Sequence, residues 1–173
     1  LLGDYDTIYC LVSGGIDSTW LYVMLKQQYG TKVVPVNCYN PFETSVTLDR
    51  LQSDDPSFLS IAPHKGLNYG DILRQAFLKL PEARELKKRG KYHKKIFPCC
   101  YYIKHKAFLN DPLFQKPGTV VVSGIKRGDG TQRRIWLTQL SKGQEPRNQS
   151  KGLPTHFHQH VGGQMYFYPF RDY

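Results

Sequence analysis

The chain has 173 residues, of which 40% are hydrophobic, and its formal net charge is +10 at pH 7. This length and composition predict one soluble globular domain over residues 1–173, large enough to bury about two-thirds of its unfolded surface. No stretch approaches the ~20 apolar residues of a membrane span and the N-terminus lacks the profile of a secretory signal, so we expect a cytoplasmic protein whose charge calls for an anionic partner.

Strand and helix patterns alternate along the chain. Apolar, β-branched runs predict strands at residues 7–12, 32–38, 119–125 and 165–170, the last at a sheet edge, with Pro35 as an irregularity in the second. Helical periodicity is found at residues 19–29, 45–52 and 99–109, and at 71–89 as one helix or as two broken at Pro81. The segment 141–163 reads as a long mobile loop. This order predicts an α/β fold, a mostly parallel sheet flanked by helices in three layers, with ligands at the carboxyl ends of the strands.

The most informative segment lies between the first strand and the first helix. Two adjacent glycines let main-chain N–H groups converge on an anion, and the helix that follows directs its unpaired N–H groups and positive dipole end at the same point. Serine hydroxyls add donors, and Asp17 offers a hard oxygen for Mg²⁺. We therefore expect a pyrophosphate group and its metal to bind at Ser13, Gly14, Gly15, Ile16, Asp17 and Ser18.

The sequence Ser-Gly-Gly-x-Asp-Ser in this position resembles the PP-loop of the ATP pyrophosphatase superfamily. The resemblance implies a PP-loop, adenine nucleotide alpha hydrolase-like fold that binds ATP and Mg²⁺ and cleaves ATP between its α and β phosphates. The Walker A spacing G-x-x-x-x-G-K-[ST] is absent, so nothing supports a kinase or an ordinary ATPase.

Further segments are similar to the phosphoadenosine phosphosulfate reductase-like branch of that superfamily. They are Pro41-Phe42-Glu43-Thr44 with Leu48-Asp49-Arg50-Leu51, Pro98-Cys99-Cys100 with Lys104, Ser123-Gly124-Ile125-Lys126-Arg127 with Arg133, and Tyr168-Pro169-Phe170. One segment of three residues departs from the pattern. The family's Asp-Thr-Gly at the end of the second strand reads Asn37-Cys38-Tyr39, which removes the expected basis of a contact to the nucleoside.

The intact first loop separates two activities within that branch. Sulfonucleotide reductases generally carry a degenerate loop, so this chain looks more like the ATP-using relatives, such as sulfurtransferases that modify tRNA or DNA. The reductase's C-terminal redox cysteine is absent, which leaves open either a true difference or a chain that continues past Tyr173.

Four cysteines do not form the pattern of a disulfide framework. Cys10 and Cys38 lie on predicted strands and are expected to fill the core. For Cys99 and Cys100 three interpretations stay open: small core residues, a thiolate or persulfide nucleophile activated at a helix N-terminus, or, by resemblance, ligands of half an iron–sulfur cluster whose completing C-x-x-C is absent.

Basic residues follow the third predicted strand, where Gly124 belongs to the expected nucleotide site. Arginine forks bind phosphate oxygens in bidentate fashion, so a basic cluster on a glycine loop can close over a triphosphate. We assign this catalytic role to Lys126, Arg127 and Arg133, against the alternative of a solvated surface.

A second basic region, from Arg84 to Lys106, holds nine Lys or Arg residues interleaved with aromatic rings. This mixture suits a nucleic-acid or persulfide-donor partner, and equally a solvated helix face. The alternating His156, His158 and His160 favour surface histidines over a metal site, because no acid or cysteine lies near them in the sequence.

These patterns lead to one main functional expectation and two alternatives. The main one is a PP-loop enzyme that adenylylates an acceptor with release of pyrophosphate, in sulfur transfer. The alternatives are a sulfonucleotide reductase and a non-catalytic module that binds nucleotide or nucleic acid. The sequence does not identify the acceptor.

Overall fold

The structure is a computed structural model. It describes residues 1–40, 45–63, 68–88, 107–108, 111–130, 134–135, 137–138, 149, 152, 156–159 and 164–172. The chain divides into two compact units. The first comprises Leu1–Asn37, Thr44–Leu59 and Pro112–Tyr173, and the second comprises Cys38–Glu43 and Ser60–Asp111. The expectation of a single domain over residues 1–173 stays a prediction.

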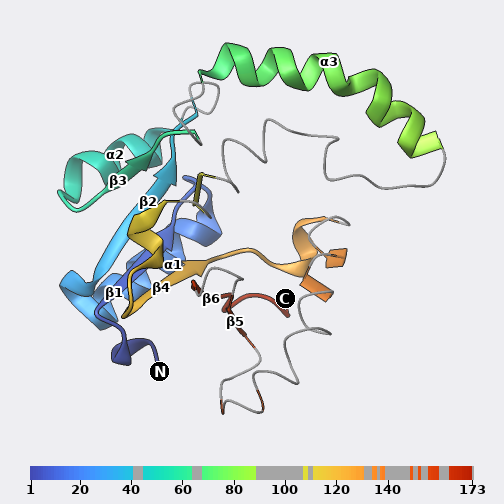
Figure 1. Cartoon of the computed structure of the whole chain (residues 1–173). Coiled ribbons are helices and arrows are strands. Elements are labelled where there is room, and N and C mark those ends of the chain that lie inside the picture. Colours follow the sequence, from blue (N-terminus) through green and yellow to red (C-terminus); the bar gives the residue numbers. More distant parts are fainter. Residues whose placement is uncertain are drawn as a thin grey trace. The chain divides into compact units, whose positions relative to one another are not determined.

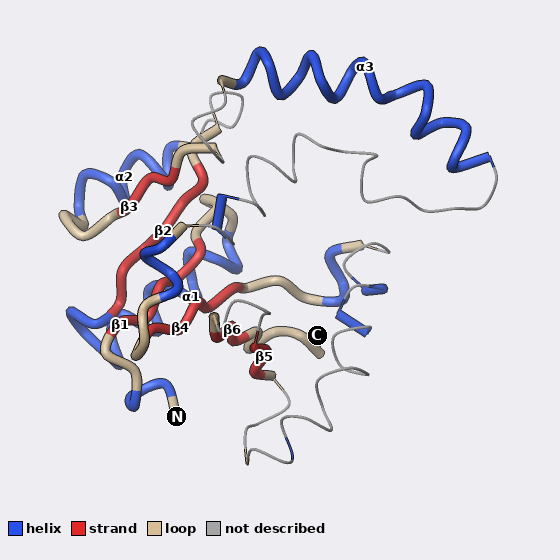
Figure 2. The backbone as a smooth tube through the Cα atoms, in the orientation of Figure 1, coloured by secondary structure: helices blue, strands red, loops and turns tan. Residues whose placement is uncertain are grey.

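A mixed, mostly parallel sheet organises the fold (Figures 1 and 2). Its strands lie in the order β3-β2-β1-β4-β6-β5. The β1–β2, β1–β4 and β4–β6 pairs are parallel, and β5–β6 is antiparallel. The α/β class with a mostly parallel sheet is therefore confirmed. The strands are β1 (Thr7–Leu11), β2 (Val33–Cys38), β3 (Leu59–Ile61), β4 (Thr119–Ser123), β5 (Phe157–Gln159) and β6 (Met165–Phe167).

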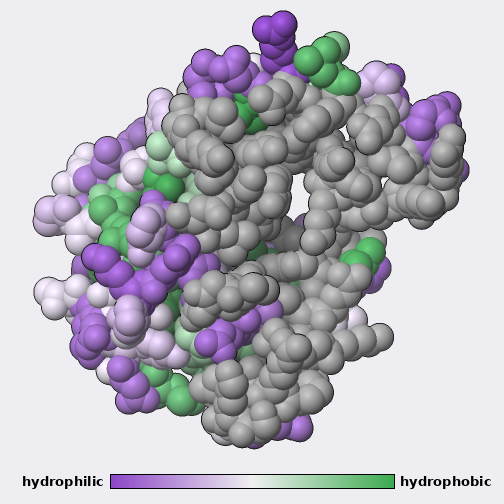
Figure 3. Space-filling view, in the orientation of Figure 1, coloured by the Kyte–Doolittle hydropathy of each residue, from purple (hydrophilic) through white to green (hydrophobic). Residues whose placement is uncertain are grey.

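The core of the first unit forms around β1, β4 and the helix α1 (Ile16–Tyr29). Every residue of β4 is buried, as expected of a parallel strand covered on both faces. From α1, Leu21, Tyr22 and Leu25 pack into this core, and partly buried side chains of α2 (Val46–Asp54) pack against it. The helix α1 also carries exposed apolar residues, among them Trp20. Figure 3 shows hydrophobic side chains scattered among hydrophilic ones on the face that it draws.

Pro35 lies within β2, an interior strand, where proline is rare. The N–H of Val12 donates to the carbonyl of Val36 at 2.9 Å, so Val36 directs its backbone groups toward β1. Since successive residues of a strand direct these groups to opposite sides, the missing N–H of Pro35 lies on the side away from β1, and the β1–β2 ladder is not interrupted.

Several element predictions need correction. The helix α1 begins at Ile16 rather than Thr19, because Gly15 serves as its N-cap. The strand at residues 165–167 is not an edge strand, because β5 forms within the predicted loop 141–163 and pairs with it. His158 of β5 is buried rather than on the surface, since it lies opposite Tyr166 in that pair. Strand β3 was not predicted at all.

In the second unit, α3 (Tyr69–Lys88) is one continuous helix, so Pro81 does not break it. A proline inside a helix removes one intrahelical hydrogen bond and costs about 3 kcal/mol, and α3 nevertheless continues through Pro81 to Lys88. Asn68 caps its start, accepting a hydrogen bond from the N–H of Asp71 at 2.8 Å. Over the part of the chain that the structure describes, no helix is both long and apolar enough to cross a membrane.

Candidate functional site

The predicted phosphate loop joins β1 to α1 at the carboxyl end of the sheet. Gly14 has φ 76°, a left-handed conformation that glycine adopts without strain. Gly15 is the N-cap of α1, and because it has no side chain it supplies no capping bond to the first-turn amides. No hydrogen-bond partner for the N–H groups of Gly14, Gly15, Ile16 and Asp17 is found among the described residues. These four amides and the start of α1 therefore form a site with the donors and dipole that an anion requires.

The hydroxyl groups of the two loop serines lie within hydrogen-bond distance of each other, with Ser13 exposed and Ser18 buried. Ser13 donates its backbone N–H to Ser18 Oγ at 3.2 Å, and the two hydroxyl oxygens are also 3.2 Å apart. The Ser18 hydroxyl donates to the carbonyl of Gly15 at 3.1 Å, and its side chain is buried. In this arrangement Ser18 bonds to both ends of the loop, and the donors left for a ligand are the main-chain amides and the hydroxyl of the exposed Ser13.

The segment that follows β4 delivers a cation to this loop. Lys126 Nζ lies 2.6 Å from Asp17 Oδ2, and this pair joins residues 109 positions apart in the sequence. The hydrogen bond to Asp17 raises the pKa of the Lys126 ammonium above its ordinary value of 10.5. The side chains of Lys126 and Asp17 are 32% and 53% exposed, so both remain accessible to a ligand.

The backbone of Lys126 is held in place by its own loop. Its N–H donates to Asp129 Oδ2 at 3.1 Å, and the N–H of Asp129 donates back to the Lys126 carbonyl at 3.3 Å. These bonds close the turn η7 (Arg127–Asp129). The Lys126 side chain can therefore reorient while the loop that carries it stays in place.

Gly124 of the predicted site lies between α1 and the end of the chain. A Cβ added there would stand 3.6 Å from atoms of both Leu21 and Phe170. Phe170 also contacts Trp20, with ring centroids 5.8 Å apart. Three segments singled out in the sequence, around residues 13–18, 123–127 and 168–170, therefore meet at one end of the sheet.

The N-terminus of α2 lies against the same loop. Ser45 caps α2, accepting a hydrogen bond from the N–H of Leu48 at 3.4 Å. A Cβ on Gly14 would stand 2.1 Å from Ser45 Oγ and 3.1 Å from Leu48 Cγ. Gly14 is therefore required for the approach of α2 as well as for its own backbone angle.

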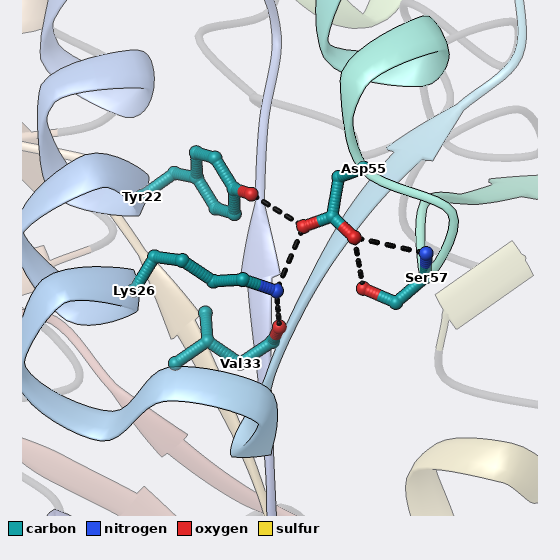
Figure 4. Close-up of polar contacts among 5 residues, drawn as sticks. All are labelled: Tyr22, Lys26, Val33, Asp55 and Ser57. Carbon is teal, nitrogen blue, oxygen red and sulfur yellow. Dashed lines mark hydrogen bonds and ion pairs between the residues drawn. The ribbon is translucent and has the colours of Figure 1, made fainter.

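The other end of α2 is fixed by a buried network that the sequence analysis did not identify (Figure 4). Asp55 Oδ2 accepts from the Tyr22 hydroxyl at 2.5 Å and pairs with Lys26 Nζ at 2.8 Å. Its Oδ1 accepts from the N–H and hydroxyl of Ser57 at 2.9 and 2.6 Å. Burial by itself raises the pKa of Asp55, but the hydrogen bonds from Lys26, Ser57 and Tyr22 outweigh it and lower this pKa below 3.8. The Asp-Pro dipeptide at residues 55–56 is a turn signal that the sequence shows. No local pattern identifies Tyr22 and Lys26 of α1 as the partners of Asp55.

The structure tests the cysteine assignments in part. Cys10 and Cys38 are both buried, as expected of core residues. Burial raises the pKa of Cys10 to about 12, so its thiol stays protonated and unreactive near neutral pH. Within the described part of the chain no group of three or more His, Cys, Asp or Glu side chains could hold a metal on its own.

Several predicted site residues lie outside the described residues. They are Cys99, Cys100, Arg133, the side chain of Arg127, the segment 41–44, His160 and most of the basic region from Arg84 to Lys106. Arg84 and Lys88 of that region are exposed on α3. The roles given to these residues stay predictions.

No protein-family model matches the sequence, and no curated protein matches it significantly.

Proposed function

We propose that the chain is a PP-loop enzyme that binds ATP and adenylylates an acceptor with release of pyrophosphate. The observation that carries the proposal is the ion pair between Lys126 and Asp17, which brings a cation to a loop whose outward donors include main-chain amides. A converging set of amides next to an accessible ammonium is the arrangement that binds a polyphosphate.

The chemical step follows from what these groups can bind. An acceptor nucleophile attacks the α-phosphorus of ATP, the bond between that phosphorus and the α–β bridging oxygen breaks, and pyrophosphate leaves with the electron pair. The amides of residues 14–17 would bind the pyrophosphate portion, and Lys126 would offset its growing negative charge. Arg127 and Arg133 are proposed to complete this cluster.

Asp17 fits Mg²⁺ as a single ligand. Its carboxylate is a hard oxygen donor and is half exposed, and Mg²⁺ is commonly held by one or two carboxylates together with phosphate oxygens and water. A bound Mg²⁺ would neutralise phosphate charge. Because Oδ2 of Asp17 is already paired with Lys126, the carboxylate would have to share or release the ammonium when the metal arrives.

Sulfur transfer is the acceptor chemistry that we favour. It rests on the resemblance of the segments around residues 41–51, 98–104 and 123–133 to the phosphoadenosine phosphosulfate reductase-like branch. In this chemistry a persulfide donor loads sulfur onto Cys99 or Cys100, the outer persulfide sulfur attacks the adenylylated centre, and AMP leaves with the oxygen. A thiol reductant then cleaves the acceptor–S–S–Cys disulfide, which leaves the sulfur on the acceptor and oxidises the thiol. An iron–sulfur cluster at these cysteines stays a second hypothesis.

The first experiment compares ligands and products. Calorimetry with Mg·ATP and with phosphoadenosine phosphosulfate should give tighter binding of ATP, and candidate acceptors should stimulate pyrophosphate release. Sulfite release from the phosphosulfate would replace the proposal with a sulfonucleotide reductase. Nucleotide binding without either product would favour a binding module.

A second arm tests Lys126 with a matched control. Lys126→Met should weaken Mg·ATP binding about 10-fold or more, because it removes a charged hydrogen-bond donor beside the loop amides. Lys88→Met removes an exposed lysine that pairs with Glu85 at 2.8 Å, and it should leave Mg·ATP affinity unchanged. Equal affinities for the two variants would contradict the role of Lys126.

A further inference from the structure

The first peptide of the phosphate loop, between Val12 and Ser13, is held at both of its polar groups by side chains. Its carbonyl, on Val12, accepts a hydrogen bond from Asn37 Nδ2 at 2.7 Å. Its N–H, on Ser13, donates to Ser18 Oγ at 3.2 Å. Asn37 belongs to β2 and Ser18 to α1, so the two side chains reach the peptide from different elements.

The need for Asn37 follows from where β1 ends. The strand ends at Leu11, and Val12 keeps one more ladder bond through its N–H to the carbonyl of Val36. Val12 is buried, so its carbonyl requires a partner inside the protein once the chain leaves the sheet. The Asn37 amide supplies this partner and thereby extends the β1–β2 pairing by one residue. An aspartate at position 37 could not do so, because an ionised carboxylate has no hydrogen to donate.

The orientation of this peptide affects the residues that follow. While its N–H is bonded to Ser18, the chain enters Gly14 in the left-handed conformation, and the amides of residues 14–17 are left without partners among the described residues. A reversed peptide would direct the Val12 carbonyl toward Ser18 and the Ser13 N–H toward Asn37. The Ser18 hydroxyl would then have to give up its bond to the Gly15 carbonyl, and the Asn37 amide would have to turn over to present its oxygen. The bonds made by the two side chains therefore favour the observed orientation of the peptide.

We propose that Asn37 is a positioning residue that, together with Ser18, fixes the Val12–Ser13 peptide so that the loop amides are aligned for phosphate. This inference rests on the proposed function of the loop. It also gives a role to the position at which the sequence departs from the family's Asp-Thr-Gly: the Asn37 Nδ2 group is engaged by the loop backbone rather than directed at a nucleoside.

The test uses Asn37→Asp, which keeps the shape of the side chain but places a carboxylate oxygen against the Val12 carbonyl. Gln27→Glu is the matched control, because it makes the same amide-to-carboxylate change at an exposed position of α1. Two measurements are made on each folded variant: the amide NMR signals of Gly14 and Gly15 without ligand, and the affinity for inorganic pyrophosphate. We expect Asn37→Asp to move both glycine signals and to weaken pyrophosphate binding about 10-fold or more, with no such change in the control.

Ser18→Ala removes the bond on the other side of the same peptide, from the Ser13 N–H to Ser18 Oγ. This variant tests the inference if Asn37→Asp fails to fold. It should move the same two glycine signals, and in the double variant the loss of pyrophosphate affinity should be smaller than the sum of the single losses. Unchanged glycine signals in Asn37→Asp or in Ser18→Ala would overturn the inference, even where pyrophosphate still binds. If the wild-type chain does not bind pyrophosphate, the proposed function fails, and the glycine signals still decide the positioning role.

Discussion

At the scale of single residues, three glycines of the first unit distinguish backbone strain from steric crowding. Gly14 has φ 76° and no room for a Cβ. Gly30 has φ 59°, but an added Cβ would meet no atom within 4 Å. Gly15 has neither a positive φ nor a close neighbour. We expect Gly15→Ala to cost about 0.5–1 kcal/mol, because alanine is a poorer N-cap than glycine. Gly30→Ala should cost about 1–3 kcal/mol for backbone strain alone, because its φ of 59° and ψ of −127° lie in a region that residues with a Cβ rarely adopt. Gly14→Ala should cost about 2–4 kcal/mol, because overpacking against Ser45 adds to that strain.

Chemical denaturation of the three variants measures these differences. Pyrophosphate affinity should fall in Gly14→Ala and stay unchanged in Gly30→Ala, since Gly30 lies at the far end of α1 from the loop. If Gly14→Ala destabilises the protein no more than Gly15→Ala does, the close approach of α2 to Gly14 is contradicted.

At the scale of elements, α2 is held at both ends, by Ser45 against Gly14 and by Asp55 among Tyr22, Lys26 and Ser57. Asp55→Asn should destabilise the protein by about 3 kcal/mol, because it leaves a partly buried lysine without its counter-charge. Asp49→Asn, at an exposed position of the same helix, is the control and should change stability by less than about 0.5 kcal/mol.

The same network predicts how stability depends on pH. The folded-state pKa of Asp55 lies below its ordinary value of 3.8, so the unfolded chain binds a proton at this group more readily than the folded one. The stabilisation is fully present well above pH 3.8 and is lost as pH falls from there toward the folded-state pKa. Acid unfolding should therefore be less steep in Asp55→Asn than in the wild type. An identical pH profile in the two proteins would contradict the network.

At the scale of the whole molecule, the net charge of +10 means that any polyanion stabilises the chain to some extent. A specific phosphate site adds more to the free energy of unfolding, about 2.7 kcal/mol at a pyrophosphate concentration 100 times its dissociation constant. For a chain of this size that corresponds to a rise in melting temperature of roughly 5–10 °C. In Gly14→Ala, pyrophosphate should raise the melting temperature no more than sulfate does at equal ionic strength. Equal rises in the wild type and the variant would assign the whole effect to net charge.

The sequence by itself determined those features that depend on local signals. The β-branched run at residues 119–125, the strand and helix on either side of residues 13–18 and the glycines of the loop all lie within a few positions of the residues that specify them. Parallel strands direct their carboxyl ends to one edge, so the approach of residues 123–127 to the loop was also predictable in outline.

Only the tertiary structure decided which side chains meet. Strands β3 and β5 have three residues each, too few to show a period, and they form because a neighbouring strand offers an edge. Three of these contacts join residues that are far apart in the sequence. Lys126 and Asp17 are 109 positions apart, Asn37 and Val12 are 25 apart, and Tyr22 and Asp55 are 33 apart. Such contacts depend on how elements pack and on the burial of their polar groups, and no local pattern of residues encodes either quantity.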